Sequence, residues 1–587
     1  MPEKSNDPFQ FWQELKRRKV IRVITVYAAT SFVILELTSI IVEPLRLPEW
    51  TLQMVIVLLA VGFVISVILS WIYDVTPEGI RKTEPVSKVK EELRETPSRI
   101  RGWKIATYLS IFIIIALIVF NILGGRTRRV DLSDLEKSIA VLPFENLSEE
   151  EGQAWFSDGI TDIIITQLSK ISDFRILGRT STLKYRTGDK SIYEIGEELG
   201  VNFIIEGTVQ RAEENVRIIV QLLRVRNEDH IWSDLYDRPW IEFFSIQNEI
   251  ALDVAHELNI ALSPDEKEQI TGKPTENLEA YDLYLQGRYY WNQRSNEGVM
   301  KSIDYYEKAI DLDTNYALAY SGLADAYYIC ADWNYLDPDY AFRRAKIFAH
   351  KALILDNKIA EAYATLGGVA NYLENDYELA DLFFRHSLNL NPNYASVNQW
   401  YAMFLTGQGR FEEARIYIKK ALELDPTSAI INFAAGFMHY FFEEYDTALI
   451  QYEKVQSINP QFPTIPLGFL KCYLQTGLND EARELCYNWL ADDPAFRLYH
   501  TNSGTKEITL ELYLNYLIDY NHNRNYPNWY HIAFLYMKLG EQKKALDALV
   551  RAIEGKSTDY LFINVDPVFK DLHSEPRFKA LLEEIGL

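Results

Sequence analysis

The 587-residue sequence contains little cysteine and no recognisable metal-binding motif. Its three cysteines, Cys330, Cys472 and Cys486, are too few for a disulfide scaffold, and none has a CxxC partner. The nine histidines are scattered, and no HExxH motif occurs. The sequence therefore predicts no metal site and no cofactor.

Two of the cysteines, Cys472 and Cys486, fall on neighbouring helices of one predicted pair. A disulfide needs Cα atoms within about 7 Å, whereas the axes of tightly packed helices lie about 8–10 Å apart. We therefore expect two free, buried thiols.

Positive charge is scarce over most of the chain. The first 130 residues carry 18 Lys and Arg against 12 Asp and Glu, so the remainder carries 42 against 71. Phosphate contacts require clustered Lys and Arg, and such an acidic region is a poor binder of polyanions. Nucleic acid is therefore disfavoured as a partner.

Long apolar runs are present near the amino terminus: Val20–Val42, Thr51–Tyr73 and Ile105–Leu123. Each is long enough to cross a bilayer, which takes about 20 residues. Lys and Arg concentrate before the first run and between the second and third, which favours a cytoplasmic side for both places. The pattern predicts a membrane domain over 20–124, with spans 20–42, 51–73 and 105–123.

This arrangement implies a cytoplasmic tail over 1–19 and a cytoplasmic loop over 74–104. Everything after residue 124 is expected in the periplasm of a bacterium, with the protein anchored in the inner membrane and the lipid bilayer as a partner.

The stretch "SIAVLPFENLSEEEGQAWFSDGITDIIITQL" places six acidic residues between two apolar runs. The first run has strand character, the polar middle is typical of a loop, and apolar spacing from Trp155 indicates a helix. Ser157 or Asp158 is expected to cap that helix or a restart within it. The six acids are Glu145, Glu149, Glu150, Glu151, Asp158 and Asp162.

Further strand and helix patterns follow, and three strand-like segments are joined by hairpin-length turns. A final helix is expected over about 241–262. Together these elements predict an α/β sandwich over 138–262.

The segments "SIAVLPFENLS", "FSDGITDIIITQLSKI", "IGEELGVNFIIEGTVQR" and "HIWSDLYDR" resemble the TolB amino-terminal-like domain. That domain occurs in CadC-related regulators and beside bacterial cyclase domains. The resemblance implies a binding or coupling module without catalytic residues. The six carboxylates are then loop and cap groups rather than an acid/base pair, because no oriented partner is visible.

A repeat of fixed length occupies the carboxyl-terminal half. Pro392, Pro426, Pro460 and Pro494 are spaced by 34 residues, and Ala or Gly recurs between them where paired helices must touch. This pattern resembles the tetratricopeptide repeat. We expect about seven repeats over 280–556 and a cap over 557–587, whereas residues 495–525 fit no repeat.

In the tetratricopeptide family, the first helix of each repeat lines the concave face of a superhelix. The resemblance implies that aromatic residues at those positions form a partner-binding groove for a protein or peptide. The alternative is that a neighbouring helix, the α/β domain or residues 495–525 cover them. The positions are Trp291, Tyr328, Tyr372, Phe433, Phe437, Tyr440, Phe441, Tyr530 and Phe534.

The sequence thus predicts a multi-domain fold: three transmembrane helices, an α/β domain resembling the TolB amino-terminal-like domain, and an all-α tetratricopeptide superhelix. It favours a non-enzymatic, membrane-anchored scaffold or sensor that binds protein or peptide partners. An alternative is a CadC-like signal-transducing regulator acting through a separate cytoplasmic partner, since no winged-helix domain precedes the first span. An enzyme is less favoured, because no nucleophile elbow, phosphate loop or metal cluster is found. Homo-oligomerisation stays open.

Overall fold

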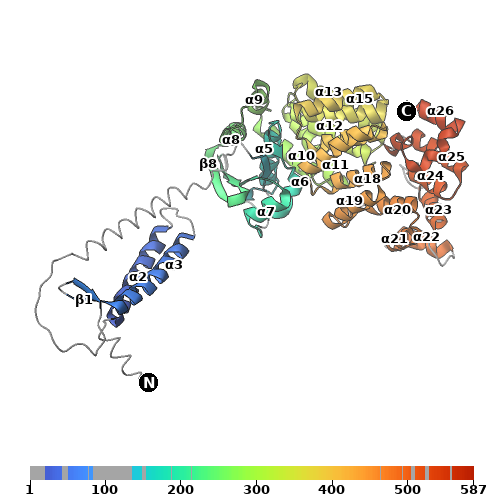
Figure 1. The fold of residues 1–587 in the computed structure, drawn as a ribbon. Coiled ribbons are helices and arrows are strands. Elements are labelled where there is room, and N and C mark those ends of the chain that lie inside the picture. Colours follow the sequence, from blue (N-terminus) through green and yellow to red (C-terminus); the bar gives the residue numbers. More distant parts are fainter. Residues whose placement is uncertain are drawn as a thin grey trace, which may run out of the picture. The chain divides into compact units, whose positions relative to one another are not determined.

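The computed structural model (Figure 1) describes most of the chain after residue 134 and parts of the segment before it. The chain divides into two compact units, Met1–Arg129 and Val130–Leu587. The described residues are 20–42, 50–76, 79–82, 135–148, 154–186, 188–212, 215–462, 464–491, 494–503, 509–521, 528–555 and 558–587.

The first unit contains a helix pair and a short hairpin. Helix α2 (Val20–Val42) packs against α3 (Trp50–Ile72), and β1 (Tyr73–Thr76) pairs antiparallel with β2 (Gly79–Lys82). The Tyr27 hydroxyl donates to the carbonyl of Leu59 at 2.9 Å, which joins the two helices.

The prediction of a membrane domain is corrected by the structure. Among the residues that it describes, no helix combines the length and the apolar character needed to cross a bilayer. The run 105–123 lies outside the described residues. The prediction rested on the length and apolar composition of each run. The first run also contains two charged residues, Arg22 and Glu36. The predicted three transmembrane helices and the multi-pass inner-membrane location are therefore not supported.

The second unit begins with a small mixed sheet in the strand order β5-β3-β6-β7-β8, with β4 beside β6. Strand β3 runs parallel to β5 and β6, whereas β6, β7 and β8 form an antiparallel meander. The strands are β3 (Ser138–Val141), β4 (Glu145–Asn146), β5 (Arg175–Ile176), β6 (Phe203–Ala212), β7 (Asn215–Arg224) and β8 (Asp229–Pro239). The strand expected in the first apolar run is β3, and the three expected strands joined by hairpin-length turns are β6, β7 and β8.

Helices cover both faces of this sheet. Apolar side chains of α5 (Ala154–Ser169) and α8 (Phe243–Glu257) share one core with alternate residues of β6 and β7, as period-two strands require. Helix α7 (Ile192–Leu199) packs on the other face, against Ala140 and Ile204. The remaining helical segments here are α6 (Arg179–Thr182), η3 (Leu183–Tyr185), η4 (Val225–Asn227), η5 (Trp240–Glu242) and α9 (Pro264–Thr271).

Antiparallel helix pairs follow from residue 278, and Figure 1 shows them in chain order from α10 to α25. Seven pairs have tetratricopeptide lengths, and α22 (Pro494–Ser503) and α23 (Leu510–Asn521) lie between the sixth and the seventh. The pairs are α10 (Leu278–Trp291) with α11 (Asn296–Leu312), α12 (Ala317–Asp332) with α13 (Pro338–Leu355), α14 (Ala360–Val369, extended by η6, Ala370–Glu374) with α15 (Tyr377–Leu390), α16 (Ala395–Gly407) with α17 (Phe411–Leu424), α18 (Ala429–Phe441) with α19 (Tyr445–Ile458), α20 (Ile465–Thr476) with α21 (Asn479–Ala491), and α24 (Trp529–Lys538) with α25 (Gln542–Glu554). The chain is thus mostly helical, with a small mixed-sheet domain.

Glycine on the first helix of a repeat lets an aromatic ring of the second helix insert. A Cβ on Gly287 or Gly322 would lie 2.5 or 2.7 Å from the ring of Tyr306. Gly436 and Gly468 flank Tyr452 in the same way, each at 2.6 Å. First helices of successive repeats also contact one another, for example α14 with α16 and α16 with α18. We refer to α10, α12, α14, α16, α18, α20 and α24 together as the A-helix layer.

The chain ends in η7 (Thr558–Phe562), η8 (Pro567–Ser574) and α26 (Pro576–Glu584). These elements contact α24 and α25 beside them, as a cap would, but η7 also contacts α16, three repeats earlier. The carboxyl-terminal segment therefore returns across the A-helix layer.

Candidate functional site

The aromatic residues expected to form a groove all belong to the A-helix layer or its extension η6, and most are interior. Tyr372, Phe433 and Phe437 are half-buried. The other six are at most 4% exposed: Trp291, Tyr328, Tyr440, Phe441, Tyr530 and Phe534.

Two ring clusters bring several of these residues together. Tyr328 lies 4.7 Å from Trp400, and Tyr372 stacks on Phe342 at 5.7 Å between ring centroids. On α18, Phe437 and Phe441 each lie 5.0 Å from Phe562 of η7. The aromatic anchors of α18 thus already have an occupant, supplied by the end of the same chain.

Phe433 occupies a different environment. Its ring lies 5.6 Å from Tyr452, on the second helix of the same repeat, and 5.2 Å from Phe462, in the turn that follows. The predicted groove residues of α18 therefore have two different sets of neighbours, the carboxyl-terminal segment for Phe437 and Phe441 and the second helix of the repeat with its turn for Phe433. Partner binding at the nine residues stays a prediction.

The carboxylate of Asp566, in the carboxyl-terminal segment, contacts two helices of the A-helix layer, α18 and α24. Asp566, 2% exposed, accepts a hydrogen bond from the Tyr440 hydroxyl at 2.8 Å and from the Tyr530 hydroxyl at 2.5 Å. Its Oδ1 also accepts from the Val568 amide at 3.0 Å, which makes it the N-cap of η8. Two predicted groove residues from distant repeats therefore meet at one acidic side chain that the sequence pattern did not single out.

The α/β domain is joined to the first repeat by buried polar contacts. On α5, Asp162 accepts two hydrogen bonds from the Arg288 guanidinium of α10, at 2.9 and 2.8 Å. Nearby, Arg211 of β6 pairs with Asp282 of α10 at 3.0 Å. Gly159 lets the two helices approach, since a Cβ there would lie 3.3 Å from Leu285.

The junction continues along the turns between later repeats. The Asn393 amide donates to the carbonyls of Ser169 and Ile171 at 3.3 and 3.1 Å. Farther on, the Gly178 amide donates to the carbonyl of Leu424 at 2.7 Å, and the Ser181 hydroxyl donates to Asp425. One domain therefore contacts the first repeat, the turn after the third repeat, and the end of the fourth repeat with the turn that follows it.

These contacts correct the roles expected for two acidic residues. Helix α5 begins at Ala154, so Asp158 lies within it rather than at its cap. Asp158 pairs with Arg179 at 3.0 Å and with Arg186, and Asp162 pairs with Arg288. Both acids are 6% exposed. Their partners lie 21 to 126 residues away, too far for a local pattern to indicate.

Burial shifts the pKa of two further acids near this junction. Desolvation raises the pKa of Asp325 to about 7, opposed by a hydrogen bond from Thr365. Desolvation likewise raises the pKa of Asp425 to about 6, opposed by hydrogen bonds from Ser181 and Thr180. Among the described residues, no group of His, Cys, Asp and Glu is arranged to hold a metal ion.

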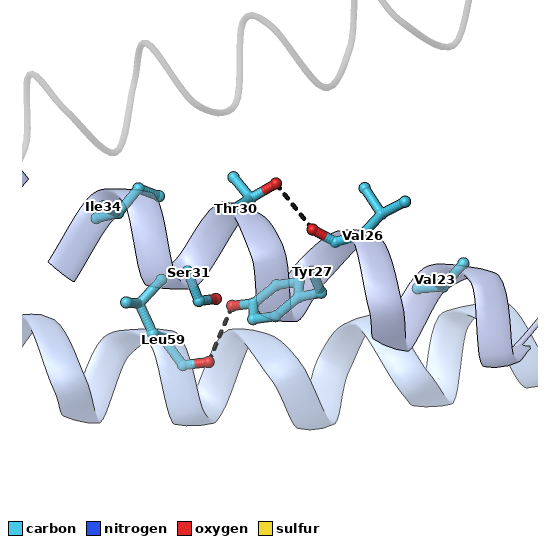
Figure 2. Close-up of a pocket in the computed structure, with 7 residues that line it drawn as sticks. All are labelled: Val23, Val26, Tyr27, Thr30, Ser31, Ile34 and Leu59. Atoms are coloured by element: carbon cyan, nitrogen blue, oxygen red, sulfur yellow. Dashed lines mark hydrogen bonds between the residues drawn. The ribbon is translucent and has the colours of Figure 1, made fainter. Parts of the chain in front are cut away.

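A separate apolar hollow of about 470 Å³ lies between α2 and α3 (Figure 2). Its lining includes Val23, Val26, Ile34 and Leu59, and the Tyr27 hydroxyl beside them is engaged with the Leu59 carbonyl. The seven residues that line it include no charged side chain.

Comparison with family models supports the two-part organisation of the second unit. Residues 135–251 match the model described as "HilA/YgeH-like transcriptional regulator, second domain". The tetratricopeptide repeat model matches residues 395–428 and 526–556. The chain therefore contains tetratricopeptide repeats and a HilA-like domain, and the resemblance to the TolB amino-terminal-like domain is not supported.

Two curated proteins are similar over part of their length. The chain is 32% identical over 235 residues to "Putative adenylate cyclase 3" of Rhizobium meliloti, covering 39% of each chain. It is 24% identical over 356 residues to "Transcriptional regulator HilA" of Salmonella typhimurium, covering 59% of this chain and 62% of that one. The chain thus spans about two fifths and three fifths of these relatives.

One solved structure of a repeat protein is pilF of Pseudomonas aeruginosa, at 20% identity. The match covers 40% of this chain and 96% of that one, with a TM-score of 0.25.

Proposed function

We propose that the chain is a non-enzymatic regulatory protein that captures a protein or peptide partner with its tetratricopeptide repeats and relays that event to its HilA-like domain. The observation that carries this proposal is the buried junction between the two parts, centred on Asp162 and Arg288. Tetratricopeptide arrays serve as scaffolds for protein contacts, and the HilA-like domain is related to a domain of transcriptional regulators.

The junction supports a relay because it fixes the domain to several repeats at once. Buried ion pairs and hydrogen bonds are directional, so a change in the spacing of the repeats strains them. Asn393 and Leu424 lie at the turns after the third and fourth repeats, whereas Arg288 lies in the first. A partner that alters the packing of these repeats therefore alters the surroundings of the domain.

A binding role fits the acidic residues better than acid/base catalysis. Asp158 and Asp162 are each paired with an arginine, Arg179 at 3.0 Å and Arg288 at 2.8 Å, so both carboxylates are engaged within the chain. General acid/base work needs a titratable group within hydrogen-bond reach of a substrate. Both side chains are instead packed inside the chain.

The test compares binding with catalysis in one preparation. A tagged full-length chain is cross-linked in its source cells, purified and analysed by mass spectrometry, and the same chain is incubated with ATP and Mg²⁺ and assayed for cyclic AMP. We expect a reproducible partner absent from an untagged control and no cyclic AMP. Cyclic AMP formed in proportion to the amount of chain, without a partner, would contradict the proposal.

A further inference from the structure

The carboxyl-terminal segment, residues 558–587, is attached to repeats that lie far from it in sequence. The Tyr560 hydroxyl donates to Asn375 Oδ1 at 2.8 Å, directly after η6 of the third repeat. The Tyr377 hydroxyl, at the start of α15, donates to the carbonyl of Ile585 at 2.6 Å. A cap on the last repeat requires none of these contacts. The segment instead lies on the A-helix layer as a ligand would.

Four consecutive side chains of the segment, all aromatic or aliphatic, are buried. Tyr560, Leu561, Phe562 and Ile563 are each at most 4% exposed. Phe562 stacks on Phe441 with its ring plane tilted by 20° and meets Phe437 edge-on at 88°. Stacked and edge-on arrangements are the favoured ones for aromatic pairs. The two phenylalanines of α18 therefore favour an aromatic side chain at the position of Phe562.

A carboxylate follows four residues later. Asp566 accepts hydrogen bonds from the hydroxyls of Tyr440 and Tyr530, which belong to the fifth and the seventh repeat. Hydrogen bonds to a charged acceptor are stronger than neutral ones, so this pair of tyrosines recognises an acid rather than an amide.

The surface beneath the segment carries the complementary charge. Lys471 of α20 is 6% exposed, and its Nζ lies 4.7 Å from the ring centre of Tyr530. It attracts Asp559 of η7 and thereby opposes the rise in the pKa of that acid, which burial causes. Lys538 of α24 donates to the carbonyl of Leu474 at 2.9 Å. The charge of Asp566 opposes the fall in the pKa of Lys538 that burial causes, so each of these acids of the segment attracts a basic residue of the repeats.

We propose that residues 558–570 occupy a peptide-binding face of the repeats in cis, and that the partner presents the same chemistry: an aromatic ring with a carboxylate four residues after it. This proposal rests on the proposed function and specifies its partner. The face comprises Phe437, Tyr440 and Phe441 of α18, Lys471 of α20 and Tyr530 of α24. The partner binds when the segment leaves, so the free chain is held closed.

The short elements of the segment suit a removable occupant. Both η7 and η8 are 3₁₀ helices, whose hydrogen bonds are weaker than those of an α-helix. The segment is held by side chains of several repeats, among them Asn375, Phe441 and Tyr530.

The test uses the full-length chain and a fluorescent peptide of residues 558–570, TDYLFINVDPVFK. Asp566→Asn in the chain weakens the hydrogen bonds from Tyr440 and Tyr530 that hold the segment on the face, but it keeps a side chain that can cap η8. We expect this variant to bind the peptide at least tenfold more tightly than the unmodified chain. A peptide with Phe562→Ala and Asp566→Asn should show no such gain.

Further variants distinguish peptide binding at the face from a general loss of structure. Adding Tyr440→Phe and Tyr530→Phe to the Asp566→Asn chain should abolish the gain. Adding Tyr306→Phe should not, because the Tyr306 hydroxyl has no hydrogen-bond partner among the residues that the structure describes. Equal peptide affinity of variant and unmodified chains, or loss of cooperative unfolding in Asp566→Asn, would overturn the proposal. Dimerisation of the variant without peptide binding would assign the face to a second copy instead. The peptide titration needs no cellular partner, so its failure leaves the proposed function standing.

Discussion

Arg288 of the first repeat donates two hydrogen bonds to a single carboxylate oxygen of Asp162, which precedes it by 126 residues. Their side chains are only 16% and 9% exposed. The pair ties the longest helix of the α/β domain to the first helix of the array. The α/β domain and the repeats consequently form one compact unit, in which the surfaces of α5 and α10 that face each other are covered.

Replacing Arg288 with Gln should strongly destabilise the chain. Removing one member of a buried ion pair leaves the other charge without compensation and typically costs about 3–5 kcal/mol. We expect a clear fall in the urea midpoint of unfolding, with Asp162→Asn added to Arg288→Gln recovering part of the loss.

The matched control is Arg343→Gln. Arg343 pairs with Asp339 one turn away on α13, and both side chains are exposed, at 63% and 38%. Such surface pairs contribute about 0.3–0.5 kcal/mol. Equal effects of the two substitutions would show that the junction contributes nothing beyond a surface contact.

Local periodicity was sufficient to predict the repeats and the strands. Pro426 and Pro460 mark the turns before α18 and α20, and the middle one of the three strand-like segments joined by hairpin-length turns is β7. The same reasoning could not find the partners of Asp158 and Asp162, because an arginine on another element leaves no mark at fixed spacing. It also could not show that Phe562 covers Phe437 and Phe441, since a segment returning over more than 120 residues obeys no period.

Asp425 should make stability depend on pH. Burial raises its pKa from an ordinary value of 3.8 to about 6, so the folded state holds the proton to higher pH than the unfolded state. The free energy of unfolding should therefore fall as the pH rises from about 4 through 6 and then level off. Asp425→Asn removes this contribution, which is on the order of 3 kcal/mol.

The measurement is urea unfolding of both chains at several pH values from 4.5 to 8. The unmodified chain should lose more stability over this range than Asp425→Asn. A parallel pH dependence in the two chains would mean that Asp425 titrates normally.

Gly322→Ala should destabilise the array. Its new Cβ would lie 2.7 Å from the ring of Tyr306, which Gly287 confines on the opposite side. Overpacking of this kind costs about 1–3 kcal/mol, visible as a lower melting temperature. Gly272→Ala is the control, because its Cβ would approach nothing closer than 3.8 Å. A variant of Gly322 that melts like the unmodified chain would show that the ring has room to move.

The three cysteines should behave as protected thiols. The prediction that Cys472 and Cys486 are free and buried is confirmed, and Cys330 is free and buried as well. Burial raises the pKa of each to about 12, which removes the reactive thiolate at neutral pH. Iodoacetamide should label none of them in the native chain within minutes and all three in urea. A linked Cys472–Cys486 peptide in a non-reducing digest would refute this.

The double substitution Phe433→Ala and Phe437→Ala tests whether these side chains support the fold. Phe433 contacts Tyr452 and Phe462, and Phe437 contacts Phe441 and Phe562. Truncating phenylalanine in a core typically costs about 3–5 kcal/mol, and both rings here are half-buried. We expect a large drop in melting temperature. An unchanged melting curve with weaker partner capture would instead support a free groove at these residues.

The central claim is that the repeats and the HilA-like domain capture a partner as one unit, and quantitative co-purification tests it most directly. Tagged chains carrying Arg288→Gln, Tyr306→Phe or no substitution are expressed at equal levels and compared by mass spectrometry, at a temperature where all three are folded. We expect the same partner with the unmodified and Tyr306→Phe chains, and at least severalfold less of it with Arg288→Gln. Equal recovery with all three chains, or no protein above the untagged control, would contradict it.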